Sequence, residues 1–380
     1  MSGAFKLRRF LRAAPSGGGY VPPVGGVTGG AGSGGGSGSV INITDANDLY
    51  AKLNAPGTYG GHILQLPANT DLGTFYTPAT DFTSNPITVL GQTGSTFTIL
   101  GVYCKGVRFK NFTVSGGPGE TFAIGPGTGA AYVTFENVIA NSGAADGTPS
   151  STQGWQIRNA DNIMLIGARN NAINDIFGFG NSMSIIDSTN ITVTGLTVKN
   201  NGTDGILFTG TTNLYLEGLL GYEFHGDIAG GDHPDWIQGF GNSATILIKN
   251  CGWMRNTGGE SQGYFFEDCD GITVQSCWLY GGMLNSVAIA RGDTALFDDN
   301  YLVGYADYGS EVIVRGAYAN ATVTNNYVGS ISNYAADGVN PNFVPASGNG
   351  SNTLIGTVTP GDFTGLGAWL STHTNARGHI

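Results

Sequence analysis

The chain has 380 residues and a formal charge of −11, and 64 of its residues are glycine. The glycines follow no three-residue period, which excludes a collagen helix. So much glycine with only 11% charged residues argues against a helical bundle. Hydrophobic residues make up 40% of the chain, yet no run of about 18 apolar residues occurs, so we expect a large all-β body without membrane insertion.

The charge is spread unevenly along the chain. Four of the 16 basic residues lie within the first 13 positions, which leaves 12 basic residues against 27 acidic ones in the rest. Such an acidic body is expected to repel nucleic acid. No apolar stretch follows the basic cluster, so we expect no secretory signal peptide. Residues 29–39 are almost pure Gly and Ser, and we interpret residues 1–40 as a basic segment with a flexible linker.

The first ordered elements are expected directly after this linker. Thr44 or Asp45 is a suitable N-cap for a short helix that runs through Leu53, with Leu49 and Leu53 on one face. An alternating strand is predicted at residues 62–66. A helix placed here would cover the open end of a sheet.

A repeat of 23 to 32 residues follows over most of the chain. Each unit reads apolar-x-apolar-x and then a small turn-forming residue, with a further apolar residue three places after it. The units begin at Val107, Val133, Ile163, Ile191, Leu214, Ile246, Ile272, Ala295 and Ala321. The turn place holds Asn111, Asn137, Gly167, Gly195, Gly218, Asn250, Ser276, Asp299 and Asn325. Each unit also contains a second predicted strand.

Repeats of this length with several strands and no helices predict a β-solenoid. In a parallel β-helix, each coil stacks about 4.8 Å from the last, like side chains form ladders, and Asn or Gly turns the corners. We therefore predict about ten coils over residues 41–340. Residues 341–380 leave the pattern, and a short helix from Asp362 to Leu370 is expected to form a C-terminal cap over the last coil.

The alignment of coils also bears on the four cysteines. Cys251 and Cys277 occupy the same place in neighbouring coils, so their side chains should point in parallel, which does not favour a bridge. Cys104 and Cys269 share another place but lie six coils apart. We predict stacked, buried thiols and no disulfides.

One string within the repeat resembles a known group. His233–Gln238 reads HPDWIQ, and Gln262–Glu267 follows one coil later. Together with the coil pattern, it resembles right-handed parallel β-helix proteins: pectate-lyase-like polysaccharide lyases, alginate epimerases, and spikes of bacteriophages or gene-transfer agents. The resemblance implies an all-β fold, a single-stranded right-handed parallel β-helix of about ten coils with an N-terminal capping helix. For a spike it implies a homotrimer.

Four longer loops should rise from one edge of such a rod and wall a groove: residues 142–154, 171–182, 222–235 and 254–263. Residues 225–235 hold two His and three Asp. They are interpreted as a loop that caps its own backbone, a Ca²⁺ site, or an acid/base site acting on a glycan. No cofactor, or Ca²⁺, is expected. The catalytic candidates are Asp227, His233, Asp235 and Glu267. For elimination, His233 or Tyr264 is the candidate base, and Arg255 or Ca²⁺ would neutralise a uronate.

The strand ends supply candidate substrate contacts. Gln238, Glu267, Arg291 and Arg315 are expected to form a row that is either a polar surface ladder or a series of contacts to sugar hydroxyls and carboxylates. The aromatic residues are expected in the core or as sugar-stacking platforms, and alternation does not decide whether Trp236 or Ile237 points inward. The full set of substrate-binding candidates is Trp236, Gln238, Arg255, Gln262, Tyr264, Arg291 and Arg315.

Three functions are consistent with these sequence features. The first is a virion spike of a phage or phage-like particle that binds, and in one version cleaves, host cell-surface polysaccharide, with residues 1–40 contacting capsid or tail proteins. The second is a free polysaccharide lyase, hydrolase or epimerase acting on an acidic glycan, which would be extracellular by a route other than Sec. The third is a surface adhesin without catalysis.

Overall fold

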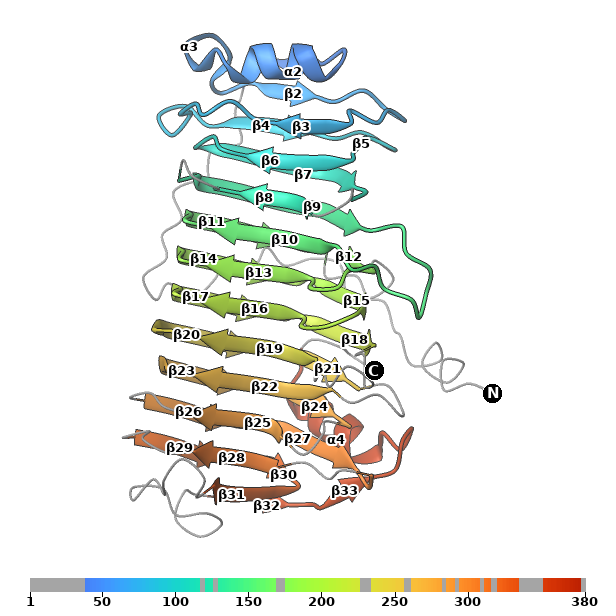
Figure 1. The fold of residues 1–380 in the computed structure, drawn as a ribbon, viewed down its shortest axis with the longest axis vertical. Helices are drawn as coiled ribbons and strands as arrows, with labels where there is room; N and C mark the ends of the chain where they lie inside the picture. The colour runs from blue at the N-terminus through green and yellow to red at the C-terminus, as the bar shows by residue number, and fades with distance from the viewer. Residues whose placement is uncertain are drawn as a thin grey trace.

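The computed structural model describes residues 38–116, 120–125, 129–168, 175–225, 234–255, 261–281, 285–290, 294–307, 311–315, 320–334 and 351–376. The chain winds into a rod of stacked coils, with every strand parallel to its neighbours in the coils before and after it (Figure 1). The winding is right-handed. This confirms the predicted right-handed parallel β-helix.

Each coil contributes strands to three parallel sheets, which we number in chain order within a coil. Sheet 1 contains β3 (Thr74–Tyr76), β6 (Ile99–Val102), β8 (Glu120–Ile124), β10 (Gln153–Arg158), β13 (Met183–Ile186), β16 (Ile206–Thr209), β19 (Asp235–Phe240), β22 (Gln262–Glu267), β25 (Asn285–Ala290), β28 (Glu311–Arg315) and β31 (Ser330–Tyr334). These eleven stacked strands agree with the expected number of about ten coils.

Sheet 2 contains β1 (Val40–Asn42), β2 (Ile63–Gln65), β4 (Ile87–Leu90), β7 (Val107–Val114), β9 (Ala131–Asn141), β11 (Asp161–Ile166), β14 (Thr189–Thr194), β17 (Thr212–Glu217), β20 (Ser243–Lys249), β23 (Cys269–Gln275), β26 (Thr294–Asp298) and β29 (Asn320–Thr324). Sheet 3 contains β5 (Thr96–Phe97), β12 (Ile176–Phe177), β15 (Thr197–Asn201), β18 (Leu220–Phe224), β21 (Gly252–Met254), β24 (Trp278–Tyr280), β27 (Tyr301–Tyr305), β30 (Tyr327–Val328), β32 (Thr353–Leu354) and β33 (Thr357–Val358). The long strands β7 and β9 pass through the corner and pair in both sheets.

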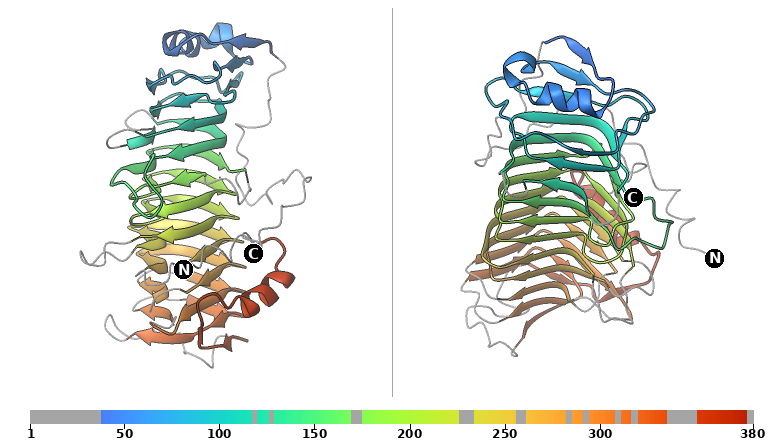
Figure 2. Two further views of the ribbon diagram at one scale, coloured as in Figure 1. Left: turned by 90° about the vertical axis from the view of Figure 1, so that its right-hand side faces the viewer. Right: turned by 45° about the horizontal axis from the view of Figure 1, so that its top comes forward.

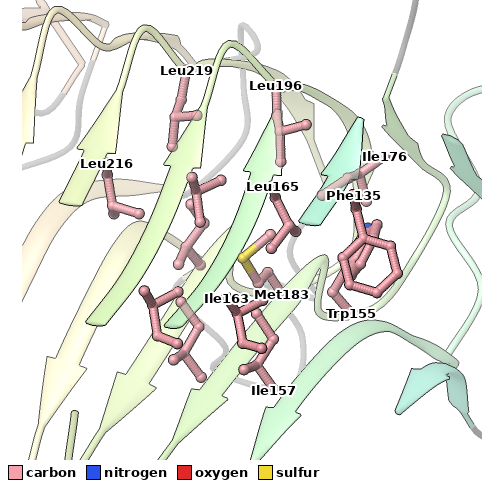
Figure 3. Packing of buried hydrophobic residues seen from close by; sticks show 14 of the residues in the cluster. Phe135, Trp155, Ile157, Ile163, Leu165, Ile176, Met183, Leu196, Leu216 and Leu219 are labelled. Carbon is pink, nitrogen blue, oxygen red and sulfur yellow. The ribbon is translucent and has the colours of Figure 1, made fainter. Parts of the chain in front are cut away.

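The register of the coils follows the repeat found in the sequence. Ile163 pairs with Ile191, which pairs with Leu214, and the ladder continues through Ile246 and Ile272. These side chains lie in one continuous core that runs the length of the rod. Figure 3 shows part of it, with Leu196 and Leu219 stacked at neighbouring corners. Because similar residues stack at a fixed spacing from coil to coil, the apolar side chains are buried inside the solenoid without a separate covering layer of helices or strands.

The corner between sheets 2 and 3 explains the small residues at the turn place. Eight of the nine predicted turn residues adopt a left-handed backbone, all except Gly167, with φ between 51° and 69°. Asn, Asp and Gly tolerate this conformation better than other residues, because a larger Cβ substituent crowds the next carbonyl.

A helix covers the N-terminal end of the rod, as predicted. Helix α2 (Ala46–Leu53) begins after Asp45, whose side chain accepts a hydrogen bond from the amide of Asp48. Leu49 and Leu53 are fully buried against the first coils. The short helix α3 (Pro56–Tyr59) follows.

The four cysteines are free and buried, in agreement with the prediction. Cys251 and Cys277 are the first two members of a row of hydrogen-bonded residues at the corner between sheets 2 and 3, which continues through Asn300 and Asn326. The amide of Cys277 donates to Oδ1 of Asn300 over 2.9 Å, and the amide of Asn300 donates to Oδ1 of Asn326 over the same distance. The amide of Cys251 points at Sγ of Cys277 at 3.4 Å, so this thiol takes the place of an asparagine acceptor.

Helix α4 (Thr364–Thr372) lies against the side of the rod (Figure 2, left). Leu366, Trp369 and Leu370 are buried against the outward-facing aromatic side chains of β24 and β27. His373 stacks on Trp369 and its Nε2 lies 2.9 Å from Oδ1 of Asp299. The predicted helix therefore exists, but it packs on the outer face of sheet 3 instead of across the last coil. Within the described segments, none of the helices is both long and apolar enough to cross a bilayer.

Candidate functional site

The longer loops leave the rod at the corner between sheets 3 and 1, which we call the loop edge. The strands that precede these loops pair with one another: Phe177 pairs with Asn141 and Lys199, and Tyr222 pairs with Lys199 and Met254. The strands that precede three of the four predicted loops therefore end at one side of the rod, as the sequence predicted. The predicted loop at residues 171–182 is different, because β12 interrupts it and pairs in sheet 3. Figure 1 shows the first of them, residues 142–152, as the long green loop beside β12 and β15.

Residues 142–152 form a wall that is held to the coils beyond it. Oδ1 of Asn200 accepts from the amide of Gly147 at 2.9 Å, and Nδ2 of Asn200 donates to the carbonyl of Ala145 at 2.9 Å. The amide of Ser150 donates to the carbonyl of Gly178. These bonds fix the loop across more than one coil, with its tip over sheet 3.

An ion cluster with two aromatic rings lies at the tip of this wall. Nζ of Lys199 lies 3.0 Å from Oδ1 of Asp146 and 3.0 Å from Oε2 of Glu223. The same ammonium lies 5.6 Å from the ring centre of Phe177 and 5.9 Å from that of Tyr222, which flank Lys199 on the outer face of sheet 3. We call these five residues the Lys199 cluster. Because both oxygens are 3.0 Å from one nitrogen, they cannot be more than about 6 Å apart.

The backbone and charge of Glu223 are unusual for a strand residue. Its φ is 58°, a left-handed conformation that is strained for a residue with a Cβ and that aligns with Asn200 in the preceding coil. Burial, assisted by the charge of Asp146, raises the pKa of Glu223 despite the nearby ammonium. Burial also lowers the pKa of His225, whose Nε2 is buried without a hydrogen-bond partner.

A ladder of polar residues lies on the other side of the loop edge, where the strands of sheet 1 begin. Asp235 pairs with Gln262, and the register places Asp204 beside Asp235 in the preceding coil. The amide of Asp235 donates to Oδ1 of Asp204 at 3.0 Å. Asp235 is 3% exposed, and its Oδ1 has no hydrogen-bond partner. Burial and the neighbouring charge of Asp204 raise the pKa of Asp235 well above its usual value.

Three of the predicted substrate contacts are buried. Trp236 and Tyr264 are fully enclosed: Trp236 lies against Phe224 at the corner, and Tyr264 pairs with Ile237 in the inward row of sheet 1. Ile237 is also fully buried, so both it and Trp236 face the core. Arg255 is 1% exposed, and its Nη2 holds both carboxylate oxygens of Asp307 at 2.7 and 2.6 Å. None of the three is available to a polymer on the surface.

The predicted pairing of Asp235 with Glu267 is wrong. Asp235 opens β19, whereas Glu267 ends β22, and the residue beside Asp235 is Gln262. Glu267 lies five residues beyond Gln262, so its Cα is about 16 Å from the level of Asp235 along the strands, whereas glycoside hydrolysis needs carboxyl groups about 5 to 9.5 Å apart. Gln238 and Glu267 also fall in different columns, because Gln238 pairs with Phe265. Both are half-buried, as is Gln262.

Other predicted residues lie beyond what the structure describes. Asp227, His233 and Arg291 fall outside the described residues. The backbone of Arg315 ends β28 and pairs with Ala290, but its side chain is outside the described part. Their proposed roles stay predictions.

Sequence reasoning missed Asp204 and the Lys199 cluster. Asp204 had a signal, since Asp204-Gly-Ile and Asp235-Trp-Ile occupy equivalent places in consecutive coils. For the cluster, the signal was a Glu at the place where the coil before has Asn200. The contact with Asp146 had none, because it joins residues 53 apart through a folded loop.

The described residues contain an open pocket, but they show no cluster of side chains suited to a metal ion. No group of three or more His, Cys, Asp or Glu side chains is arranged there to hold a metal ion. An open pocket of about 580 Å³ lies near the N-terminal end of the rod, lined by residues 91–95, 111–113, Asn137 and Ile139, away from the loop edge.

Comparison with known proteins yields structural likeness without sequence relatives. No family model matches the chain, and no curated protein matches it. Among solved structures, the A-module of a mannuronan C-5 epimerase from Azotobacter vinelandii aligns with a TM-score of 0.33 at 12% identity, over 84% of this chain and 96% of that one.

Two pectate lyases also align. A variant from Xanthomonas campestris has a TM-score of 0.30 at 13% identity, over 92% of this chain and 97% of that one. An enzyme from a Bacillus species in complex with trigalacturonate has a TM-score of 0.24 at 13% identity, over 91% and 95%. At these values the likeness concerns the path of the chain and carries no information on activity. The chain itself folds as a right-handed parallel β-helix.

Proposed function

We propose that this protein is a virion spike of a phage or phage-like particle, and that its loop edge binds an extended host cell-surface polysaccharide. The observation that carries the proposal is the Lys199 cluster. It presents two aromatic rings beside hydrogen-bonding groups, under a wall that is tied to neighbouring coils. Sugar rings offer an apolar face for such aromatics and hydroxyls for such polar groups.

The virion assignment draws on the layout of the chain. A basic, Gly/Ser-rich segment at residues 1–40 precedes the β-helix in the sequence. A Gly/Ser-rich segment ahead of a long rod is suited to presenting the rod away from a particle, with residues 1–40 contacting capsid or tail proteins. The corresponding assembly is a homotrimer of parallel rods.

Binding is tested with surface polysaccharide purified from the host, measured by affinity electrophoresis. Tyr222→Ala should weaken binding several-fold, up to about tenfold, through loss of one stacking ring. Tyr76→Ala is the matched control, because Tyr76 is an exposed tyrosine of β3, several coils away from the Lys199 cluster along the rod. Equal binding by both variants would remove the Lys199 cluster from the site.

Virion location and assembly need separate measurements. Antibodies to the rod should label purified particles in electron micrographs, and sedimentation of the full chain should give three times the chain mass of 39.3 kDa. Unlabelled particles, or a monomer in solution, would argue for the free enzyme or the adhesin.

Glycan cleavage is a second candidate, favoured by Asp204 and Asp235. A carboxyl group whose pKa is raised by burial, next to a second carboxyl group, is an arrangement that suits a general acid and its partner. Because Asp235 is 3% exposed, cleavage requires the substrate to displace part of the edge above it. New reducing ends or unsaturated sugars that disappear in Asp235→Asn would support this activity. If neither product forms from a polysaccharide that the protein binds, the cleavage activity is excluded and the binding function remains.

A further inference from the structure

We infer that the loop edge takes a glycan without carboxylates, either neutral or amino-substituted, and discriminates against polyuronates. The inference rests on the proposed glycan-binding function and names the class of sugar. It follows from the balance of charge that the described residues place along this edge.

The cation of the Lys199 cluster is already neutralised. Lys199 is 16% exposed and contacts the carboxylates of Asp146 and Glu223 at 3.0 Å each. One ammonium between two carboxylates leaves a net charge of −1. A uronate that approached this ammonium would meet Asp146 first, since the Asp146 side chain is 63% exposed.

A second cation near the edge, Arg255, is buried. The guanidinium of Arg255 is buried, stacks 4.9 Å from the ring centre of Tyr305, and binds both oxygens of Asp307. Both bonds come from one nitrogen, Nη2, so this side of the guanidinium is already occupied by a carboxylate. Arg255 is therefore not positioned to neutralise a uronate.

The negative charge along the edge affects the pKa values of two carboxyl groups, those of Asp235 and Glu223. Besides burial, the charge of Asp204 raises the pKa of Asp235, and the charge of Asp146 raises the pKa of Glu223. Among the described residues along the edge, the three carboxyl groups of Asp146, Asp204 and Glu223 outnumber the ammonium of Lys199. A ligand carboxylate held about 4 Å from one of them would lose about fivefold or more in affinity.

The remaining groups suit an uncharged ring. The rings of Phe177 and Tyr222 flank Lys199 in neighbouring strands, and both are half-buried. Stacking on such rings requires no charge on the sugar. The exposed carboxylate of Asp146 can accept hydrogen bonds from hydroxyl or ammonium groups, but not from a second carboxylate.

A matched pair of polymers tests the inference. Fully methyl-esterified polygalacturonate and de-esterified polygalacturonate share one backbone and differ in the masked carboxylate. The full chain should bind the ester at least about fivefold more tightly than the free acid at low salt, and the difference should shrink as salt rises. The same comparison is repeated with EDTA and with Ca²⁺.

Two substitutions test whether the Lys199 cluster causes the weaker binding of the free acid. Glu223→Gln and Asp146→Asn should each raise affinity for the free acid several-fold, with less change for the ester, because they remove a repelling charge. Equal or tighter binding of the free acid by the unmodified protein would overturn the inference. Tight binding of the free acid that depends on Ca²⁺ would overturn it as well. If the host polysaccharide and both polymers all fail to bind, the proposed function itself falls.

A chemical probe measures the potential without any glycan. In Thr148→Cys, the new thiol lies on the exposed wall near Asp146, and the four native cysteines are buried. It should react more slowly with the dianionic disulfide of Ellman's reagent than with cationic cystamine, relative to the control Gly367→Cys. In α4, a side chain at Gly367 meets no atom within 4 Å. The same relative rates at both positions would show that the edge carries no excess negative potential and would overturn the inference.

Discussion

The amide of Asp235 donates a hydrogen bond to Oδ1 of Asp204 across 3.0 Å, and this contact joins two acidic residues on consecutive coils. Asp235 is almost completely buried, and its pKa is raised by burial and by Asp204. The folded protein therefore holds a proton on Asp235 at pH values where the unfolded chain has released it. Stability contributed at this position is greatest in acid and falls as the pH rises above the unfolded pKa of about 3.9.

Asp235→Asn should therefore stabilise the protein near neutral pH. The amide keeps the shape of the protonated acid and carries no charge to bury. We expect thermal unfolding at about pH 7 to move to higher temperature, and the gain to shrink toward about pH 4, where the wild-type carboxyl is protonated in both states. Calorimetry across this range measures the effect. A variant that loses stability equally at all pH values would contradict the assigned protonation.

The corner around Trp236 should be intolerant of added volume. A Cβ at Gly221 would lie 2.5 Å from Cζ3 of the Trp236 ring, which is enclosed and cannot move aside. Gly221→Ala should destabilise the protein by about 1–3 kcal/mol, as overpacking does elsewhere. Gly57→Ala is the control, since its Cβ would meet no atom within 4 Å. Urea unfolding that shows equal midpoints for the two variants would contradict this packing.

The four thiols should not react with thiol reagents in the folded protein. All four cysteines are buried and free, and burial raises the pKa of Cys251 well above its ordinary value. Because the thiolate is the reactive form, Ellman's reagent should detect no thiol under native conditions and four after unfolding. A count below four in denaturant without reductant would reveal a disulfide.

Lys199 is expected to stabilise the wall, residues 142–152, more than the protein as a whole. Burial acts to lower its pKa, but hydrogen bonds to Glu223 and Asp146 outweigh burial and raise it. Partly exposed pairs contribute only about 1 kcal/mol or less, so Lys199→Met should change global stability little. It should speed hydrogen exchange of the Gly147 amide, which is bound to Asn200. Unchanged exchange would show that the Asn200 bonds suffice.

The ion pair also predicts a pH response. The raised pKa means that Lys199 contributes stability below its unfolded pKa of about 10.4, and that this contribution is lost as the pH rises through the folded value. Exchange in residues 142–152 should therefore accelerate selectively in strong alkali in the wild type, relative to Lys199→Met.

The fold was predictable because stacking repeats the same local demands in each coil. Ile191 and Leu214 take the same place as Ile163 because the core at that level is the same, and Asn250 and Asn325 turn a corner that needs a left-handed backbone. Such signals recur, so nine weak matches combine into one strong prediction.

The candidate site was harder to predict because it depends on departures from the repeat. Trp236 is buried through space left at Gly205 and Gly221, which alternation along one strand does not encode. Tyr264 was open to a surface role, but the register places it in line with Ile237. The contact of Asp146 with Lys199 arises from the path of a long loop, which no periodic pattern describes.

Helix α4 changes how the rod is expected to come apart. In a stack of coils, each unit contacts only its neighbours, so the terminal units fray one at a time. Here Phe363 contacts Tyr280, Trp369 contacts Tyr301, and His373 reaches Asp299, so one helix bridges consecutive coils. Peeling away either coil must first release the helix, and the C-terminal part of the rod should unravel as one cooperative block under heat or pulling force.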